Sequence, residues 1–131
     1  MAATESYPED LKYHREHDWA RIDGDEAVLG VTWFAANSLG ELVHFEPPAQ
    51  GASVTKDGSY GEVESVKAVS DVIAPLSGEV IEVNAKVVDA PETVNMDPYG
   101  DGWLVRIRLS DPSEVDSLLD AAAYKQVLAE Q

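Results

Sequence analysis

One lysine in this sequence lies at a predicted bend between two strands, where its amine would be available for chemistry. Lys67 lies inside the run 61–71, GEVESVKAVSD. Residues 60–66 alternate with a period of two and predict a strand, and residues 68–74 predict a second one. The bend between them lacks the Asn-Gly or Asp-Gly pair of a tight hairpin. Because a broken turn rule is typical of functional sites, we interpret Lys67 as a chemical handle, rather than as one of five lysines that hydrate an acidic surface.

A second group of residues that could do chemistry lies near the N-terminus. His14, Glu16, His17 and Asp18 are close enough in the chain to suggest a metal site or a general acid-base pair. No helical period places the two histidines on one face, however, and no second cluster completes a coordination sphere. Metal catalysis is therefore disfavoured, and an unmodified acidic binding module is the remaining alternative to a carrier.

The chain has no sulfur nucleophile of its own. It contains no cysteine, so a disulfide, a thiolate nucleophile and a thiolate metal site are all excluded. If redox chemistry occurs, its sulfur must be imported. The third histidine, His44, alternates with Val43 and Phe45 and is expected to face solvent. Since no serine lies in a nucleophile-elbow motif, no catalytic triad is expected.

Length and charge restrict the partners. A chain of 131 residues with 44% hydrophobic content is long enough for one compact domain and too short for two. Nine basic and 25 acidic side chains give a net charge of -16, which repels nucleic acids and anionic membranes and attracts proteins with basic docking surfaces. The first residues, MAATES, resemble neither a signal peptide nor a transit peptide, so the expected location is the cytoplasm of a bacterium.

The pattern along the chain predicts a small β-rich sandwich or barrel. Strand-like runs recur between turn signals at 19–22, 26–31, 41–45, 59–66, 68–74, 78–84 and 103–109. Thr32 can cap a short helix over 33–39, and Gly40 can end it in a left-handed conformation.

Two further helices are predicted at the C-terminus. Asp111 and the Pro-Ser-Glu that follows it combine an N-cap, a proline at the first helical position and an acid at the third, which predicts a helix to about Leu119. Asp120 starts another helix, whose Tyr124 can pack on the sheets. Residues 1–10 have little to anchor them and are expected to be loose, so the predicted single domain is 11–131.

Several strings resemble the glycine cleavage system H protein family. The string Val63–Asp71 is similar to the lipoylation hairpin of that family, and the resemblance extends over residues 11 to 128. The other similar strings are Glu16–Trp19, Gly30–Thr32, Leu39–Glu41, Ala74–Asn84, Pro91–Asn95, Asp97–Trp103 and Asp120–Tyr124. The resemblance implies a mainly β, barrel-sandwich hybrid fold of two small antiparallel sheets with short helices and added C-terminal helices.

The same resemblance implies a non-catalytic, lipoyl-carrying shuttle. Lys67 would carry covalent lipoate, whose disulfide accepts the aminomethyl group of glycine from the pyridoxal phosphate-dependent glycine decarboxylase. A folate-dependent aminomethyltransferase would then take the one-carbon unit, and dihydrolipoyl dehydrogenase would reoxidise the dithiol. Lipoylating enzymes would be further partners.

The resemblance also assigns side chains to the arm and its attachment. Glu64, Ser65 and Asp71 would present the hairpin to the lipoylating enzymes. Glu16, Asp18 and again Asp71 would contact the arm once it is loaded. Each of these residues has an ordinary alternative role as strand-face or surface polarity.

Related carriers fit the sequence less well. Biotinyl domains usually have methionine on both sides of the modified lysine, where this chain has Val66 and Ala68. Lipoyl domains of 2-oxo acid dehydrogenases usually have an aspartate directly before the lysine and lie on long multidomain chains. Within the H-protein pattern, Trp33 and Ala36 replace an acid and a glutamine, so residue roles transfer less directly there.

Overall fold

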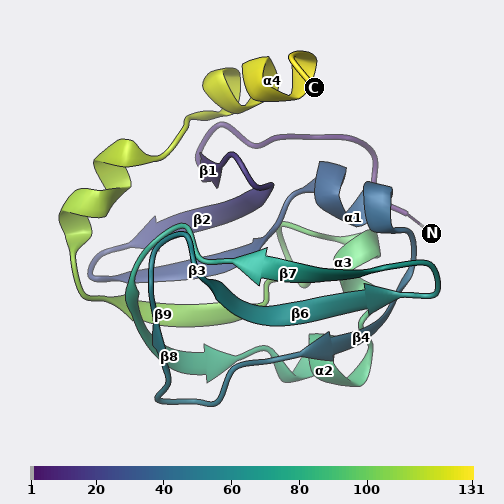
Figure 1. The fold of residues 1–131 in the computed structure, drawn as a ribbon, viewed down its shortest axis with the longest axis horizontal. Coiled ribbons are helices and arrows are strands. Elements are labelled where there is room, and N and C mark those ends of the chain that lie inside the picture. The colour runs from purple at the N-terminus through teal and green to yellow at the C-terminus, as the bar shows by residue number, and fades with distance from the viewer. Residues whose placement is uncertain (1) are drawn as a thin grey trace.

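The polypeptide forms two antiparallel sheets (Figure 1). The computed structural model describes residues 2–131. The larger sheet contains β1 (Lys12–His14), β2 (Asp18–Asp23), β3 (Glu26–Val31), β9 (Val105–Leu109), β8 (Gly78–Val83) and β5 (Ser53–Val54), in that spatial order. The smaller sheet contains β4 (Leu42–Glu46), β6 (Ser59–Ser65) and β7 (Val69–Ile73), also in spatial order. This arrangement confirms the expected sandwich of small antiparallel sheets.

Short helices connect the strands or follow the last one. They are α1 (Trp33–Leu39), α2 (Ala85–Asp89), α3 (Thr93–Met96), the 3-10 helix η1 (Pro112–Ser117) and α4 (Ala121–Ala129). Three predicted caps are confirmed. The side chains of Thr32 and Asp120 accept hydrogen bonds from the third backbone N–H of α1 and α4, and that of Asp111 accepts one from the second backbone N–H of η1. The predicted stop is confirmed as well, since Gly40 has a φ of +86°. No helix within residues 2–131 is long and apolar enough to cross a membrane.

The segment after Asp111 differs from its prediction. A helix reaching about Leu119 was expected, whereas the structure has a 3-10 helix that ends at Ser117. Its acidic residue does not fold back to the helix start. Instead, Glu114 accepts hydrogen bonds from the backbone N–H (2.7 Å) and the hydroxyl (2.9 Å) of Ser77. Glu114 thus links η1 to the residue that precedes β8.

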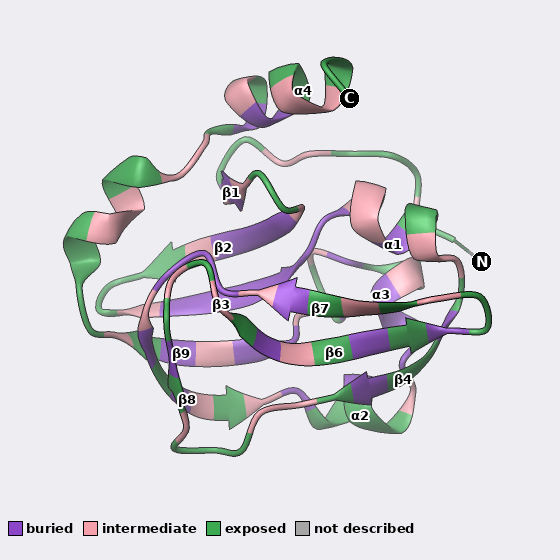
Figure 2. Ribbon diagram, in the orientation of Figure 1, coloured by how far each residue is buried: buried purple, intermediate pink, exposed green. Residues whose placement is uncertain are grey.

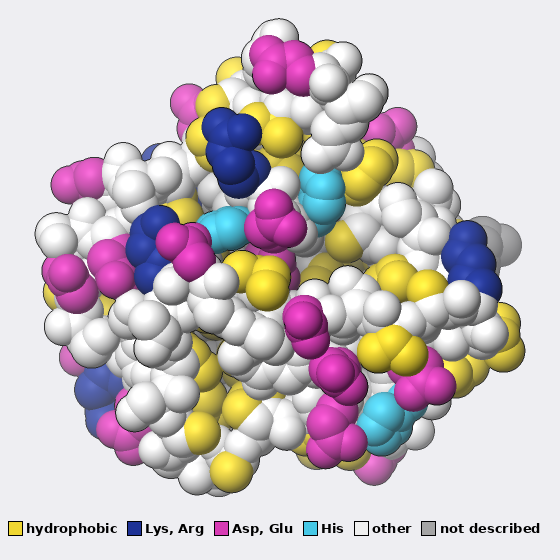
Figure 3. Space-filling view, viewed as in Figure 1, with side chains coloured by type: hydrophobic (Ala, Val, Ile, Leu, Met, Phe, Trp, Pro, Cys, Tyr) yellow, Lys and Arg dark blue, Asp and Glu magenta, His cyan; other side chains and the backbone are white. Residues whose placement is uncertain are grey.

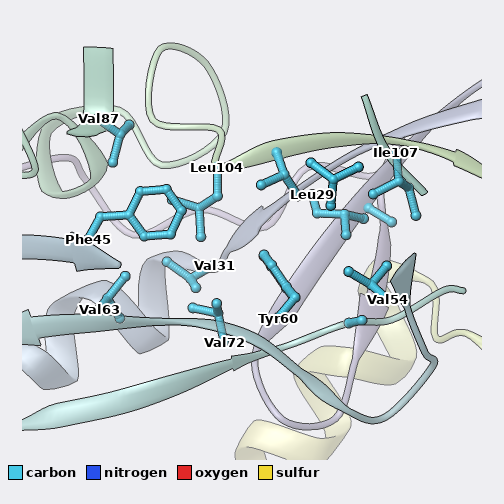
Figure 4. Close-up of a cluster of buried hydrophobic side chains, with 14 of the residues drawn as sticks. Leu29, Val31, Phe45, Val54, Tyr60, Val63, Val72, Val87, Leu104 and Ile107 are labelled. Atoms are coloured by element: carbon cyan, nitrogen blue, oxygen red, sulfur yellow. The ribbon is translucent and has the colours of Figure 1, made fainter. Parts of the chain in front are cut away.

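The main core lies between the two sheets. Phe45, Val63 and Val72 of the smaller sheet face Leu29 and Ile107 of the larger one (Figure 4). From Glu62 to Ser65 burial alternates along β6, so one face of this part of the strand points inward and the other points to solvent (Figure 2). A register shift near Gly61 interrupts the period, so Tyr60 is buried although Glu62 is exposed. The alternation fixes which hairpin side chains are available to a partner.

A second hydrophobic cluster lies between α4 and the strands β1 and β2. Its buried members are Leu11, Tyr13, Trp19, Val28, Ala121 and Tyr124. The rings of Tyr13 and Tyr124 stack with centroids 4.8 Å apart. The Tyr124 hydroxyl is 2.8 Å from the Thr32 hydroxyl, so this cluster also contacts the start of α1.

The first described residues run alongside α1 and α3. The backbone N–H of Ala3 donates to the carbonyl of Asn95 (2.9 Å), and the indole N–H of Trp33 donates to the carbonyl of Ala3 (2.8 Å). The Tyr99 hydroxyl donates to the carbonyl of Ser6 (2.6 Å). The segment expected to be loose therefore has hydrogen bonds that the sequence did not predict, from Ala3 onward.

Candidate functional site

The hairpin of β6 and β7 presents Lys67 at its turn (Figure 1). Glu64 is paired with Val69, and the backbone N–H of Ser65 donates to the carbonyl of Ala68 (2.8 Å). The buried Ser65 hydroxyl oxygen accepts from the backbone N–H groups of Lys67 (3.3 Å) and Ala68 (3.2 Å). This serine closes the turn from inside, so the hairpin does not need the glycine of a tight two-residue turn.

The Lys67 side chain is exposed and available for modification. It forms no ion pair with any residue that the structure describes. Its neighbour Val66, in the turn after β6, is 91% exposed, although valine is among the residues most often buried. An exposed amine beside an exposed apolar side chain can be reached by another protein from several directions.

Acidic side chains cover the outer face of the smaller sheet. The strand register places Glu46, Glu62 and Asp71 directly opposite one another on β4, β6 and β7. Glu64 lies on the same face of β6, two residues from Glu62, whereas Ser65 points inward. Figure 3 shows acidic side chains in a row across this face. The structure thus groups Glu64 and Asp71 on one surface and separates Ser65 from them.

Asp18 lies beneath the surface rather than on it. It is buried, and its carboxylate accepts a hydrogen bond from the backbone N–H of Ile73 on β7 (3.3 Å). Asp18 lies on β2 of the larger sheet and Ile73 on β7, an edge strand of the smaller sheet, so this bond links the two sheets. Burial raises the pKa of the Asp18 carboxyl well above its usual range, although the Ile73 N–H acts in the opposite direction. Asp71 lies two residues from Ile73 and is exposed, so the two carboxyls face different surroundings.

The other residues near the N-terminus have separate partners. Glu16 is exposed, and its backbone N–H donates to His14 Nδ1 (3.0 Å). His14 Nε2 is 2.6 Å from a carboxylate oxygen of Asp57, and this hydrogen bond lowers the pKa of Asp57. His17 Nδ1 is 2.9 Å from the Tyr124 hydroxyl, and burial lowers the pKa of His17. Within residues 2–131, no group of three potential ligands could hold a metal ion.

A groove between α1 and α3 was not predicted from the sequence. It has a volume of about 300 Å³. Its lining residues are Ala2, Trp33, Ala36, Asn37, Gly40, Glu41, Glu92, Asn95 and Met96. Four of them, at positions 33, 36, 37 and 40, follow the spacing of one helix face. That spacing is the signal by which the α1 side of the groove could have been found, but the α3 side has no comparable pattern.

The sandwich and its lysine-tipped hairpin define the class of lipoyl-type carrier domains. A family model described as "Glycine cleavage H-protein" matches residues 11–131, and the chain belongs to this family, as the sequence resemblance indicated. A "Glycine cleavage system H protein" from Anaeromyxobacter sp. (strain K) is 54% identical over 124 residues, which cover 95% of this chain and 97% of the relative. One from Symbiobacterium thermophilum is 50% identical over 117 residues, covering 89% and 91%.

A solved structure agrees with the sequence comparisons. It is the crystal structure of a glycine cleavage system H protein from Mycobacterium marinum, with a TM-score of 0.84 and 42% sequence identity. The similarity covers 91% of this chain and 96% of that chain. The relatives therefore match this chain over nearly their whole lengths.

Proposed function

We propose that this chain is a lipoyl-carrying shuttle of glycine cleavage, with lipoate attached to Lys67 and residues 11–131 as its single domain. The observation that carries the proposal is the exposed, ion-pair-free Lys67 on a turn closed by Ser65. The relatives, which are glycine cleavage system H proteins, support the glycine cleavage part of the proposal. The carrier itself catalyses no step.

The chain contributes an attachment point, reach and protection. An ammonium on a flexible four-carbon stem is a strongly hydrated point charge. Acylation makes it a neutral amide, and the net charge changes from -16 to -17 because one positive charge is lost. Lipoate supplies a disulfide that can be reduced and can carry the aminomethyl group, which suits a chain without cysteine. A tethered group can visit several active sites at high effective concentration without diffusing away.

The hairpin residues divide into two roles in this proposal. The buried Ser65 hydroxyl fixes the turn, and a lipoylating enzyme recognises the exposed side chains of Glu64 and Asp71. An acidic surface next to the lysine would attract an enzyme with a basic docking surface. The further proposed partners are the glycine decarboxylase, the aminomethyltransferase and the dihydrolipoyl dehydrogenase, in the bacterial cytoplasm.

We propose that the carboxylates of Glu16 and Asp71 hold the lipoyl arm when it carries the aminomethyl group. The loaded arm ends in an amine that is cationic near neutral pH, so exposed carboxylates attract it, each pair by about 0.2–1 kcal/mol. Asp18 is buried and would act indirectly, by holding the backbone of β7 through Ile73. Ammonia release from loaded protein without the transferase tests this assignment. Equal release from wild type and Asp71→Asn would reject the holding role of Asp71.

Lipoylation assays test the attachment point. Wild type, Lys67→Arg and the control Lys125→Arg are incubated with a lipoate ligase and a lipoyl donor, then mapped by tandem mass spectrometry. We expect one acyl group on wild type and on the control, and none on Lys67→Arg, because arginine keeps the charge but cannot form the amide. Equal acylation of all three would reject Lys67. A wild type that takes no acyl group would favour an unmodified binding module.

A further inference from the structure

Residues 3–7 form a strap that is held to the protein by its backbone. The carbonyl oxygen of Ala3 accepts a hydrogen bond from the indole N–H of Trp33 (2.8 Å), and that of Ser6 accepts one from the hydroxyl of Tyr99 (2.6 Å). Figure 1 shows this part of the chain, in purple, passing α1 on its way to β1. Large side chains of the folded domain thus donate to the main chain of the strap.

The strap buries little of its own surface. None of residues 3–7 is buried, and Tyr7 contacts the ring of Tyr124 edge-on, with centroids 5.5 Å apart. A segment with few buried apolar contacts and exposed hydrogen bonds opens at a low free energy. The strap can therefore exist in a held state and a released state, and the order-disorder change of a segment is a common form of conformational device.

A continuous series of contacts connects the strap to the lysine turn. The backbone N–H of Ala3 donates to the backbone carbonyl of Asn95 on α3 (2.9 Å). The side chain of Asn95 accepts from the N–H of Leu42, the first residue of β4 (2.9 Å). Leu42 is paired with Ser65, whose hydroxyl closes the turn that contains Lys67. A change at the strap therefore has a physical route to the turn.

Trp33 makes the strap a feature of this chain rather than of the family pattern. That pattern has an acid in place of Trp33, and the family model matches residues 11–131, which follow the strap. An ionised carboxylate only accepts hydrogen bonds, so it could not donate to the carbonyl of Ala3. The backbone N–H of Trp33 also donates to the Tyr99 hydroxyl (2.9 Å), the same group that donates to Ser6. The start of α1 and the strap are thus held together.

We propose that the strap is a conformational device that controls how firmly the lysine turn is held. In the held state, Trp33 and Tyr99 keep the strap on α1, and the strap fixes Asn95 beside the start of β4. In the released state, α3 and the start of β4 gain freedom, and Lys67 is presented less uniformly to the lipoylating enzyme. This effect on lipoylation rests on the proposed function, whereas the effect on β4 does not.

Hydrogen exchange of the full, unmodified chain tests the connection. Trp33→Phe keeps an aromatic ring but removes the indole N–H, and Ala3→Pro removes the N–H that the strap donates. In both variants the Leu42 amide should exchange about tenfold faster than in wild type, as for the loss of an ordinary pair of hydrogen bonds. The Ser65 amide should also exchange faster. The control Thr4→Pro places proline in the same exposed segment, where the described structure shows no hydrogen bond from the backbone N–H, and should leave both amides unchanged.

Two further readouts separate the possible outcomes. The amide of Ile107 in the main core should exchange as in wild type, which shows that the variants remain folded. The kcat/KM of lipoate ligase should fall about twofold in both strap variants, as for a turn that is correctly placed about half of the time. Equal exchange of the Leu42 amide in wild type and both variants would overturn the connection to β4.

The effect on the turn has its own test. Faster exchange at Leu42 with unchanged exchange at Ser65 and an unchanged kcat/KM would overturn control of the lysine turn by the strap. If Lys67 of wild type takes no acyl group, the proposed function fails, and the exchange rates of Leu42 and Ser65 still decide whether the strap holds the turn.

Discussion

Ser65 closes the lysine turn with a single hydroxyl oxygen. This oxygen accepts two backbone N–H groups, those of Lys67 and Ala68, from a position that is 4% exposed. A buried oxygen that accepts from two donors keeps both residues in one conformation. The orientation of the modified side chain is therefore set from inside the sheet.

Replacing this hydroxyl should affect the hairpin more than the rest of the protein. Ser65→Ala removes two weak hydrogen bonds, so we expect a loss of stability of about 1–2 kcal/mol and slower lipoylation. Ser65→Thr keeps the oxygen and should retain most of the lipoylation rate. Urea unfolding and the kcat/KM of lipoate ligase are the measurements. Unchanged kcat/KM for Ser65→Ala would show that the serine serves stability alone.

The buried carboxyl of Asp18 should make stability depend on pH. Its pKa in the folded protein is raised above the unfolded value, so the folded state binds more protons between these two pKa values. This group therefore lowers stability as pH rises through that interval. Asp18→Asn keeps an acceptor for the Ile73 N–H and removes the charge. We expect the variant to be more stable than wild type at neutral pH, with the difference shrinking as pH falls toward about 4.

The control for this prediction is Asp71→Asn, which removes an exposed carboxyl near the same strand position. Urea unfolding between pH 4 and 8, about the range in which carboxyl pKa shifts are visible, gives both curves. A constant difference between wild type and Asp18→Asn at every pH would contradict the raised pKa.

Single residues were predictable where strand alternation alone determines their place. Glu64 and Asp71 face outward because of the period of two, and the exposure of Lys67 follows from the turn. The burial of Asp18 was not predictable, because its partner Ile73 is 55 residues away in the chain and contributes only its backbone. A side chain with a distant backbone partner leaves no local pattern.

Element by element, long patterns were predicted well and short ones were missed. β3 has the predicted bounds, because its six residues are bounded by clear turn signals. The strands β1 and β5 have only three and two residues, which is too short for a period to be visible. Predicting β8 through Asn84 was wrong by one residue, since this side chain caps α2 by accepting from Lys86. Such caps depend on where the chain turns in space.

Asn95 should be the most sensitive polar residue between α1 and α3. Asn95→Ala removes three hydrogen bonds at once, so we expect a loss of about 2–3 kcal/mol of unfolding free energy. Asn37→Ala, an exposed substitution on α1, should change it by at most about 0.5 kcal/mol. Urea unfolding at one pH measures both. Equal effects of the two variants would contradict a bridging role for Asn95.

The whole molecule has a net charge of -16, and three of its acidic side chains form one row across the smaller sheet. Glu62 stands between Glu46 and Asp71 on neighbouring strands, and like charges directly opposite one another destabilise a sheet. The row therefore lowers the stability of the fold. A surface that lowers stability is a candidate for a role in partner binding rather than in folding.

Neutralising the middle of the row should stabilise the protein. We expect Glu62→Gln to add about 0.2–1 kcal/mol at low ionic strength and nothing in about 1 M salt, because the repulsion is screened there. Glu9→Gln removes the same charge from an exposed position outside the sheets and should have a smaller effect. Thermal unfolding at both ionic strengths measures this. A stabilisation of Glu62→Gln that persists in high salt would indicate a cause other than charge.

The second hydrophobic cluster has a consequence for how the native molecule fluctuates. It is closed by both ends of the chain: α4 covers it, and the backbone groups of Tyr13 and Leu119 exchange two hydrogen bonds of 2.8 Å. Parts of a protein that are held by chain ends open at lower free energy than its central strands. Amide hydrogens of α4 and β1 should therefore exchange with solvent together, and sooner than those of β3 and β9. A brief opening of this second cluster would leave the lysine hairpin folded on the intact sandwich.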